Sequence, residues 1–159
     1  MNISRQQHLA VESSELRKEG YAALCQLAVT CILTKTDRRA LVDHILRADK
    51  IGTGAFAMLT RLLSQKLLYA TVLKDDNACA ATATGGSRVS YVIDELEPQS
   101  GQLFHHDEYA LGQNGIHVGS LLGATLIGMK AGTRGPFLQA DGTFRSLRLL
   151  SVEHGSRAA

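Results

Sequence analysis

The spacing of apolar residues changes across Lys74–Gly86, from a helical period before this stretch to a strand-like period after it. The stretch itself is rich in Asp, Ala, Thr and Gly, which is typical of a boundary between structural units. At 159 residues the chain has the length of one ordinary domain, with room for a small appendage. The sequence therefore predicts an α+β fold, in which a helical part precedes a small sheet.

Two amphipathic helices are predicted before this boundary, because apolar residues recur there every three or four positions. The first has candidate N-caps at Thr34 and Thr36, and its apolar face consists of Leu41, Val42, Ile45, Leu46 and Ala48. The apolar face of the second consists of Phe56, Leu59, Leu62, Leu63, Leu67 and Tyr69. The glycine-containing loop Asp49–Gly54 lies between them. We therefore expect a short strand at Val29–Leu33 and an antiparallel helical hairpin within residues 29–73, with Asp49, Lys50 and Ile51 at its tip.

The two ends of the chain carry weaker patterns. Asn2–Glu19 is polar, and Gly20 interrupts any helix that continues into Tyr21–Leu27. We expect residues 1–28 to form a flexible leader, frayed or loosely helical, and residues 154–159 to form a fraying tail.

Residues 86–153 have the pattern of a small antiparallel sheet that carries one short helix. Arg88–Ile93 and Gln102–His105 are expected strands, separated by a turn over Glu95–Gly101. Two further strands, 135–139 and 143–152, flank Asp141-Gly142. This pair is a strong hairpin signal, because both residues tolerate positive φ.

The stretch Asn114–Gly132 is expected to contain a strand followed by the short helix. Ile116 to Val118 alternates like a strand, and Ser120 is a candidate N-cap. The apolar stripe of the helix then consists of Leu122, Leu126, Ile127 and Met129. Lys130-Ala131-Gly132 supplies a cation and a stop, so we expect the helix to end there.

Composition excludes several classes of protein. A net charge of +2 is too small for a protein that coats nucleic acid, so any nucleic-acid role should run through a protein partner. Three cysteines without C-x-x-C spacing argue against a disulfide framework or a structural zinc site. No run reaches the roughly 18 apolar residues of a membrane span, so we expect a cytoplasmic protein.

The run His105-His106-Asp107-Glu108 is the most metal-like one in the chain. Neighbouring residues on a strand point to opposite faces, so we expect a surface loop rather than a metal site. His117 could be paired with Cys79 or His44, but no sequence spacing supports it. No nucleophile-elbow or phosphate-binding glycine motif occurs. The sequence therefore predicts no catalytic residue and no cofactor.

Three segments resemble the regulator of nucleoside diphosphate kinase (Rnk) and, more distantly, the GreA/GreB transcript-cleavage factors. They are Gly86–Tyr91 (Gly-Ser-Arg-Val-Ser-Tyr), Gly115–Gly132, and Asp141-Gly142 with Leu147-Arg148-Leu149 before Val152. The resemblance covers residues 29–153. Leu121 stands where these families usually have proline.

This resemblance implies a C-terminal domain of FKBP-like fold and an N-terminal helical hairpin. It implies that Ser120, Leu121, Leu122, Gly123 and Leu126 bind RNA polymerase at the rim of its secondary channel, into which the hairpin points. The long hairpins of Gre factors carry acidic residues that help to hold a catalytic metal ion.

The present hairpin is short, because each expected helix spans only about 18–24 Å at 1.5 Å per residue. Its tip offers a single acid, Asp49, beside Lys50. The resemblance therefore indicates an Rnk-like, non-cleaving regulator of transcription elongation. The alternatives are a peptidyl-prolyl isomerase, suggested by the FKBP-like fold, and a self-associating module such as a homodimer.

Overall fold

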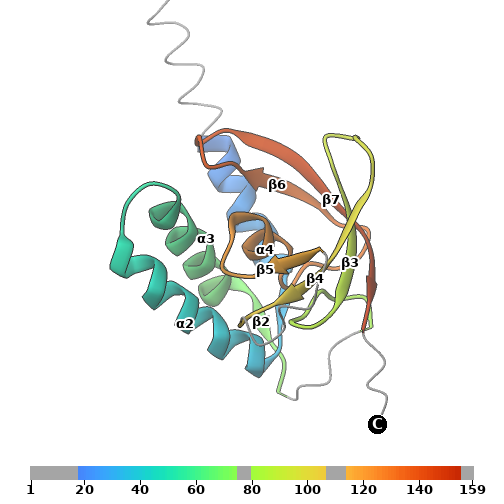
Figure 1. Ribbon diagram of the computed structural model, residues 1–159, viewed down its shortest axis with the longest axis horizontal. Coiled ribbons are helices and arrows are strands. Elements are labelled where there is room, and N and C mark those ends of the chain that lie inside the picture. The colour runs from blue at the N-terminus through green and yellow to red at the C-terminus, as the bar shows by residue number, and fades with distance from the viewer. Residues whose placement is uncertain (1–17, 75–79, 107–113, 155–159) are drawn as a thin grey trace, which may run out of the picture.

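The computed structural model describes residues 18–74, 80–106 and 114–154. The fold is α+β, with helices packed against a curled mixed sheet (Figure 1). Residues 18–30 are helical. The further elements are β1 (Ile32–Leu33), α2 (Lys35–Ile51), α3 (Ala55–Tyr69), β2 (Thr71–Val72), β3 (Arg88–Ile93), β4 (Gln99–Phe104), β5 (Gly115–His117), α4 (Leu121–Leu126), β6 (Arg134–Leu138) and β7 (Phe144–Glu153).

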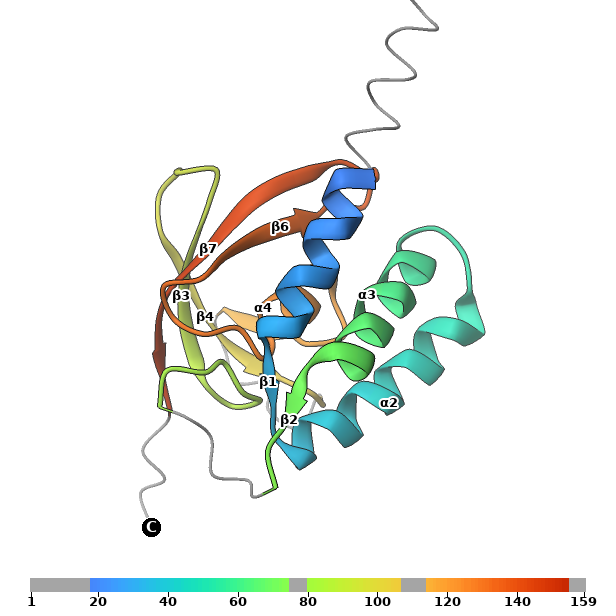
Figure 2. The ribbon, with the colours of Figure 1, turned by 180° about the vertical axis from the view of Figure 1, so that it is seen from behind.

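The helix over residues 18–30 belongs to the core, which differs from the expected frayed leader. Leu24 and Leu27 are buried in the main apolar cluster. A Cβ atom on Gly20 would lie 2.4 Å from the ring of Phe144, so glycine here allows that ring to pack directly against the helix. Figure 2 shows this helix in blue beside β6 and β7. It also continues through Thr30, so the strand expected at Val29–Leu33 shrinks to two residues.

Helices α2 and α3 lie side by side (Figures 1 and 2). The expected cap of α2 is confirmed, because the side chain of Thr34 accepts a hydrogen bond from Asp37 N at 3.0 Å. Gly52 ends α2 in the left-handed region, at φ 68°. Asp49, Lys50 and Ile51 thus form the last turn of α2, although the sequence placed Asp49 at the start of a loop.

The segments before α2 and after α3 meet as a two-stranded parallel sheet, β1–β2. Ile32 pairs with Thr71, and Leu33 pairs with Val72. β1 is also bound to the segment after α4, because Ile32 N donates to Gly128 O at 2.9 Å. The base of the helix pair is therefore hydrogen-bonded to the segment that follows α4.

The larger sheet has the order β5-β4-β3-β7-β6 and is mixed, so the expectation of a purely antiparallel sheet is wrong. β5 runs parallel to β4, with Gln102 opposite Gly115 and Phe104 opposite His117. A parallel pair cannot be joined by a tight turn, and residues 105–114 separate β4 from β5 along the chain. β4 also begins three residues earlier than expected, because the turn uses Asp94 and Glu95, both at positive φ.

The strongest hairpin signal in the sequence is confirmed. β6 and β7 are antiparallel neighbours, with Leu138 opposite Phe144, and Gly142 between them has a φ of 85°. Asp141 Oδ1 accepts hydrogen bonds from Thr143 N at 3.0 Å and from Thr143 Oγ1 at 2.6 Å. This local network closes the turn.

The helix α4 lies between the helix pair and the sheet (Figure 1). Its expected cap is confirmed, because Ser120 Oγ accepts from Gly123 N at 3.1 Å. The helix ends at Leu126, earlier than expected, since Gly128 takes a φ of 82°. Ile127 and Met129 are nevertheless buried. Among the described helices, none combines the length and apolar character needed to span a membrane.

Candidate functional site

Of the five residues that the resemblance marks for partner binding, Ser120 caps α4 and the other four lie within it, and burial divides them into two groups. Ser120, Leu121 and Leu122 are partly exposed, whereas Gly123 and Leu126 are buried. A partner can therefore touch only the first three directly. We call Ser120–Leu126 the edge. Its buried members set the shape of the surface that its exposed members present.

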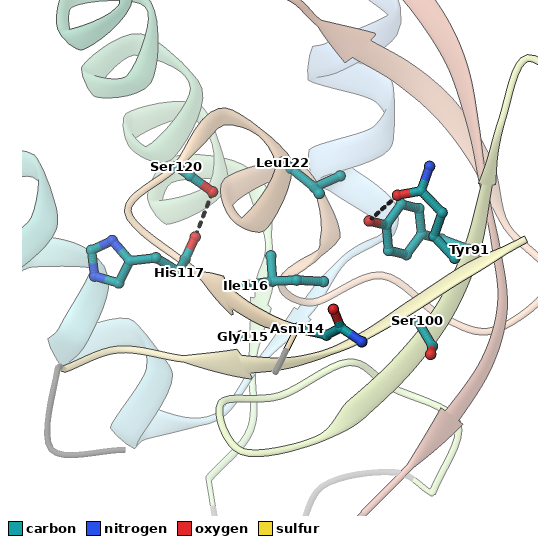
Figure 3. A pocket seen from close by; sticks show the side chains of 9 residues that line it. Tyr91, Ser100, Asn114, Gly115, Ile116, His117, Ser120 and Leu122 are labelled. Atoms are coloured by element: carbon teal, nitrogen blue, oxygen red, sulfur yellow. Dashed lines mark hydrogen bonds between the residues drawn. The ribbon is translucent and has the colours of Figure 1, made fainter. Parts of the chain in front are cut away.

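A shallow pocket of about 400 Å³ opens beside the edge (Figure 3). Side chains from β3, β4, β5 and the start of α4 meet there, which the sequence could not reveal, because these elements are distant in the chain. The lining residues are Tyr91, Gln99, Ser100, Asn114, Gly115, Ile116, His117, Ser120 and Leu122.

The pocket lining is mostly polar and includes one phenol ring. Tyr91 donates its hydroxyl proton to Gln99 Oε1 at 3.1 Å. Burial raises the pKa of Tyr91, so the phenol stays protonated at neutral pH. An isomerase would need an aromatic-lined pocket for the proline ring. The described residues around this pocket do not provide such a wall.

A buried lysine is hydrogen-bonded to the C-terminal end of the edge. Lys66 of α3 has an exposed fraction of 1%. Its Nζ donates to Thr125 O at 2.6 Å and to Ile127 O at 2.5 Å. These carbonyls lie at the C-terminal end of α4, where backbone acceptors lack partners within the helix. Burial lowers the pKa of Lys66. No local sequence pattern predicts this contact, because Lys66 and Thr125 are 59 positions apart.

Gly123 allows α4 to lie directly against the backbone that precedes it. A Cβ atom at this position would lie 2.0 Å from His117 O and 2.7 Å from Val118 Cα. Both atoms belong to the backbone and cannot rotate away. The backbone that approaches Gly123 is that of β5 and of the residue that follows it.

A series of polar contacts connects α2 to the segments before β3 and after β4. Gly85 N donates to Asp37 Oδ1 at 3.1 Å, and His105 Nε2 donates to the same oxygen at 2.8 Å. His105 Nδ1 lies 3.1 Å from His44 Nε2. The side chain of His105 is 11% exposed, so the expectation of a surface loop is wrong for this residue. Residues 107 and 108 of that run lie outside the described residues.

His44 occupies the centre of an imidazole cluster. Its ring stacks on His105 and meets His117 edge to face, with centroid separations of 5.3 and 5.1 Å. Burial and the neighbouring imidazoles lower the pKa of His44 to about 4, so this residue is neutral at pH 7. The pairing of His117 with His44, for which sequence spacing offered no support, is thus a spatial one.

The tip residues lie at the far end of α2 and point into solvent. Asp49 and Lys50 are exposed, and Ile51 is 53% exposed. The next residues are also exposed, and Gly52 and Gly54 have positive φ. In residues 18–74, 80–106 and 114–154, no cluster of three or more metal-binding side chains is arranged to hold a metal ion.

Comparisons with solved structures identify the fold. The chain is similar to the prokaryotic transcription elongation factor GreA/GreB from Nitrosomonas europaea, with a TM-score of 0.55 and 15% identity over 79% of this chain and 98% of that chain. GreA factor homolog 1 (Gfh1) of Thermus thermophilus gives 0.36 and 18%, over 79% and 99%. Gfh1 of Thermus aquaticus gives 0.40 and 19%, over 79% and 98%.

Sequence comparisons add no relative: neither the family models nor the curated proteins gave a match. The structural likeness spans nearly the whole Nitrosomonas europaea chain. At this low identity it concerns the arrangement of elements rather than the chemistry of a site. The similarity to the GreA/GreB group that the sequence indicates is therefore confirmed for the fold, whereas the Rnk-like type stays a prediction.

Proposed function

We propose that this protein is a cytoplasmic regulator of transcription elongation that binds RNA polymerase and does not stimulate transcript cleavage. The observation that carries the proposal is the shared fold, which covers 98% of the Nitrosomonas europaea elongation factor. Nucleic acid would then be reached only through the polymerase, in keeping with the net charge of +2.

Under this proposal the edge is the docking surface on the rim of the secondary channel. Leu121 and Leu122 present partly exposed apolar side chains, which can bury area against a partner. Both ends of α4 are held by hydrogen bonds, with Lys66 at the C-terminal end and with the cap at Ser120 at the N-terminal end. A preorganised surface loses little conformational entropy on binding.

The helix pair would act as a short antiparallel hairpin of the Rnk type, on an FKBP-like C-terminal domain. With 17 and 15 residues, α2 and α3 span about 26 and 23 Å. Much of α3 is used to contact the rest of the protein, because Leu59, Leu62, Leu63 and Lys66 are buried. Only the end that carries the tip is free to approach the channel.

A non-cleaving role follows from the chemistry of the tip. A hard divalent cation is held by several oxygen ligands, commonly paired carboxylates. The last turn of α2 contains one acid, Asp49, next to the cation of Lys50. We therefore expect the protein to occupy the channel entrance without supplying a metal site to the polymerase.

The direct test is co-elution of the purified protein with core RNA polymerase on a sizing column. Leu122→Glu should weaken the complex at least about tenfold, because the edge would carry a charge into a desolvated contact. Leu96→Glu is the matched control, since Leu96 is 61% exposed in a distant turn. Circular dichroism must show that both variants remain folded. Absence of co-elution, or equal loss in both variants, contradicts the proposal.

A second assay tests the non-cleaving part. Backtracked elongation complexes incubated with this protein should show no shortening of the transcript beyond the intrinsic rate. Accelerated cleavage would overturn this part and leave the binding part intact. Light scattering of the free protein would decide whether it forms the homodimer that the sequence left open.

A further inference from the structure

We propose that His44 and His117 form a binding site for a borderline divalent transition-metal ion such as Zn²⁺, with their Nδ1 atoms as ligands above Gly119. The site lies between α2 and the end of β5, next to Ser120 at the N-terminal end of the edge. It is independent of the proposed polymerase contact.

The two Nδ1 atoms face the same space. A Cβ atom on Gly119 would lie 3.0 Å from His117 Nδ1 and 3.3 Å from His44 Nδ1. It would also lie 2.6 Å from His117 Cε1, closer than ordinary contact allows. Glycine at this position therefore keeps the space between the two nitrogens open.

The hydrogen bonds of both rings use the opposite nitrogen. His117 Nε2 lies 2.9 Å from His105 O, and a carbonyl only accepts, so the His117 proton is on Nε2. His105 donates its own Nε2 proton to Asp37. In the tautomer that carries this proton on Nε2, His105 Nδ1 accepts from His44 Nε2. Both His44 and His117 then direct an Nδ1 lone pair toward the space above Gly119.

This arrangement matches the outer shell of known metal centres. A metal-binding histidine usually donates its second N–H to a carbonyl or a carboxylate, which fixes the ring and its tautomer. His117 does so to a carbonyl, and His44 does so to Asp37 through His105.

The spacing of the rings fits a shared ion. With Zn–N bonds of about 2.0–2.1 Å and tetrahedral angles, two imidazole centroids on one ion are separated by about 5 Å. The centroids of His44 and His117 are 5.1 Å apart, at an interplanar angle of 85°. Two imidazoles fill half of a tetrahedral shell, and water takes the remaining positions.

The ion would join the helix pair to the edge. His44 is on α2, whereas His117 ends β5, just before the cap of α4. A bond from each residue to one ion would fix the distance between these elements. Imidazole ligands favour Zn²⁺, Ni²⁺ or Cu²⁺ over Mg²⁺, which prefers oxygen.

The test is titration of the untagged full chain with ZnCl₂ by calorimetry, after alkylation of the cysteines that are accessible in the folded protein. We expect one ion per chain with a Kd below about 100 µM, unaffected by millimolar Mg²⁺. His44→Gln and His117→Gln should each weaken binding at least about tenfold. Glutamine keeps an N–H donor near the position of Nε2 but removes Nδ1, so the hydrogen bonds of the fold are retained.

Two further variants complete the design. Gly119→Ala should abolish binding while both histidines remain, and His154→Gln, which alters a histidine outside the cluster, should bind as the wild type does. Binding that persists unchanged in the two glutamine variants or in Gly119→Ala would overturn the proposal. So would the absence of binding at about 1 mM Zn²⁺.

A measurement on the wild-type protein guards against misfolded variants. In ¹⁵N-resolved imidazole spectra, Zn²⁺ should shift the Nδ1 signals of His44 and His117 and leave those of His154 in place. Co²⁺ should give a spectrum of nitrogen and oxygen ligands. Shifts confined to other histidines, or a thiolate-to-cobalt band in the protein before alkylation, would refute the assignment.

Discussion

The tip and the edge are both predicted to meet the same partner, but the protein holds them in opposite ways. Asp49, Lys50 and Ile51 are exposed and are followed by an exposed linker. The edge has Ser120 Oγ as its N-terminal cap and the amine of Lys66 at its C-terminal end. Substitutions at the tip should therefore leave the free energy of unfolding nearly unchanged, whereas substitutions at the edge should disturb the core and lower it.

Under the proposed function, the edge and the tip would have different roles in binding the polymerase. Docking needs a surface whose shape is fixed before contact, and buried residues such as Gly123 and Leu126 provide that shape. An element that enters a channel needs length and an adaptable end, which the last turn of α2 provides. Substitutions that separate stability from binding are the means to test this view.

Gly123→Ala should have the largest effect on stability. Its Cβ would lie 2.0 Å from His117 O, so β5 or α4 must move. We expect the free energy of unfolding to fall by about 3 kcal/mol or more in urea titrations. Gly52→Ala at the end of α2 is the matched control, because its φ of 68° lies in the left-handed region and its Cβ would meet only Asp49 O, at 3.1 Å. We expect about 1 kcal/mol there. Equal losses would remove the distinction between the two regions.

Lys66→Met should be next in size. Methionine fills a similar volume, but Thr125 O and Ile127 O lose their donor in a buried place. A buried acceptor left without a partner costs about 1–3 kcal/mol, so we expect a net loss of about 3 kcal/mol on chemical denaturation. Lys50→Met at the exposed tip should change stability by less than about 0.5 kcal/mol. A more stable Lys66→Met variant would show that burial of the charge outweighs its hydrogen bonds.

The local features of the fold, such as helix caps and turns, could be predicted from the sequence. Thr34 caps α2 and Ser120 caps α4, as expected, because each cap joins residues only three positions apart. Asp141-Gly142 forms the expected turn for the same reason. Such signals depend on backbone geometry within one turn, which the residue types alone determine.

The features that hold the edge in place could not be predicted in this way. Lys66 and Thr125 are 59 positions apart, and Asp37 and His105 are 68 positions apart. Gly20 predicts a break in the helix, yet it lies inside one, where the absence of a Cβ makes room for the ring of Phe144. Each of these residues is explained by a neighbour that only the fold brings close, so a single sequence contains no local sign of it.

Stability should depend on pH through His44 of the imidazole cluster, on α2, and not through the tip. The folded-state pKa of His44 is about 4, below the ordinary value of 6.5. The unfolded chain therefore takes up this proton first as the pH falls. The stability is complete above about pH 6.5 and is lost between about pH 6.5 and 4, by at most about 1.4 kcal/mol per pH unit.

Urea titrations at pH 7, 6 and 5 can measure this slope. His44→Gln should flatten it, because glutamine does not titrate, whereas His154→Gln should keep it. The pH range over which stability falls can also be followed with an added dye that reports unfolding, since the chain has no tryptophan for intrinsic fluorescence. An unchanged slope in His44→Gln would assign the pH dependence to another group.

The smallest effect on stability, and the sharpest test of the comparison, is expected from Ile51→Ser. Ile51 is 53% exposed at the end of α2, so the free energy of unfolding should change by less than about 0.5 kcal/mol. If the edge docks and the tip enters the channel, this variant should bind polymerase within about threefold of the wild type but alter its effect on the elongation rate. Leu122→Glu should instead lower the affinity for polymerase. Because both side chains are apolar and partly or well exposed, a similar loss of affinity in both would mean that tip and edge form one continuous contact.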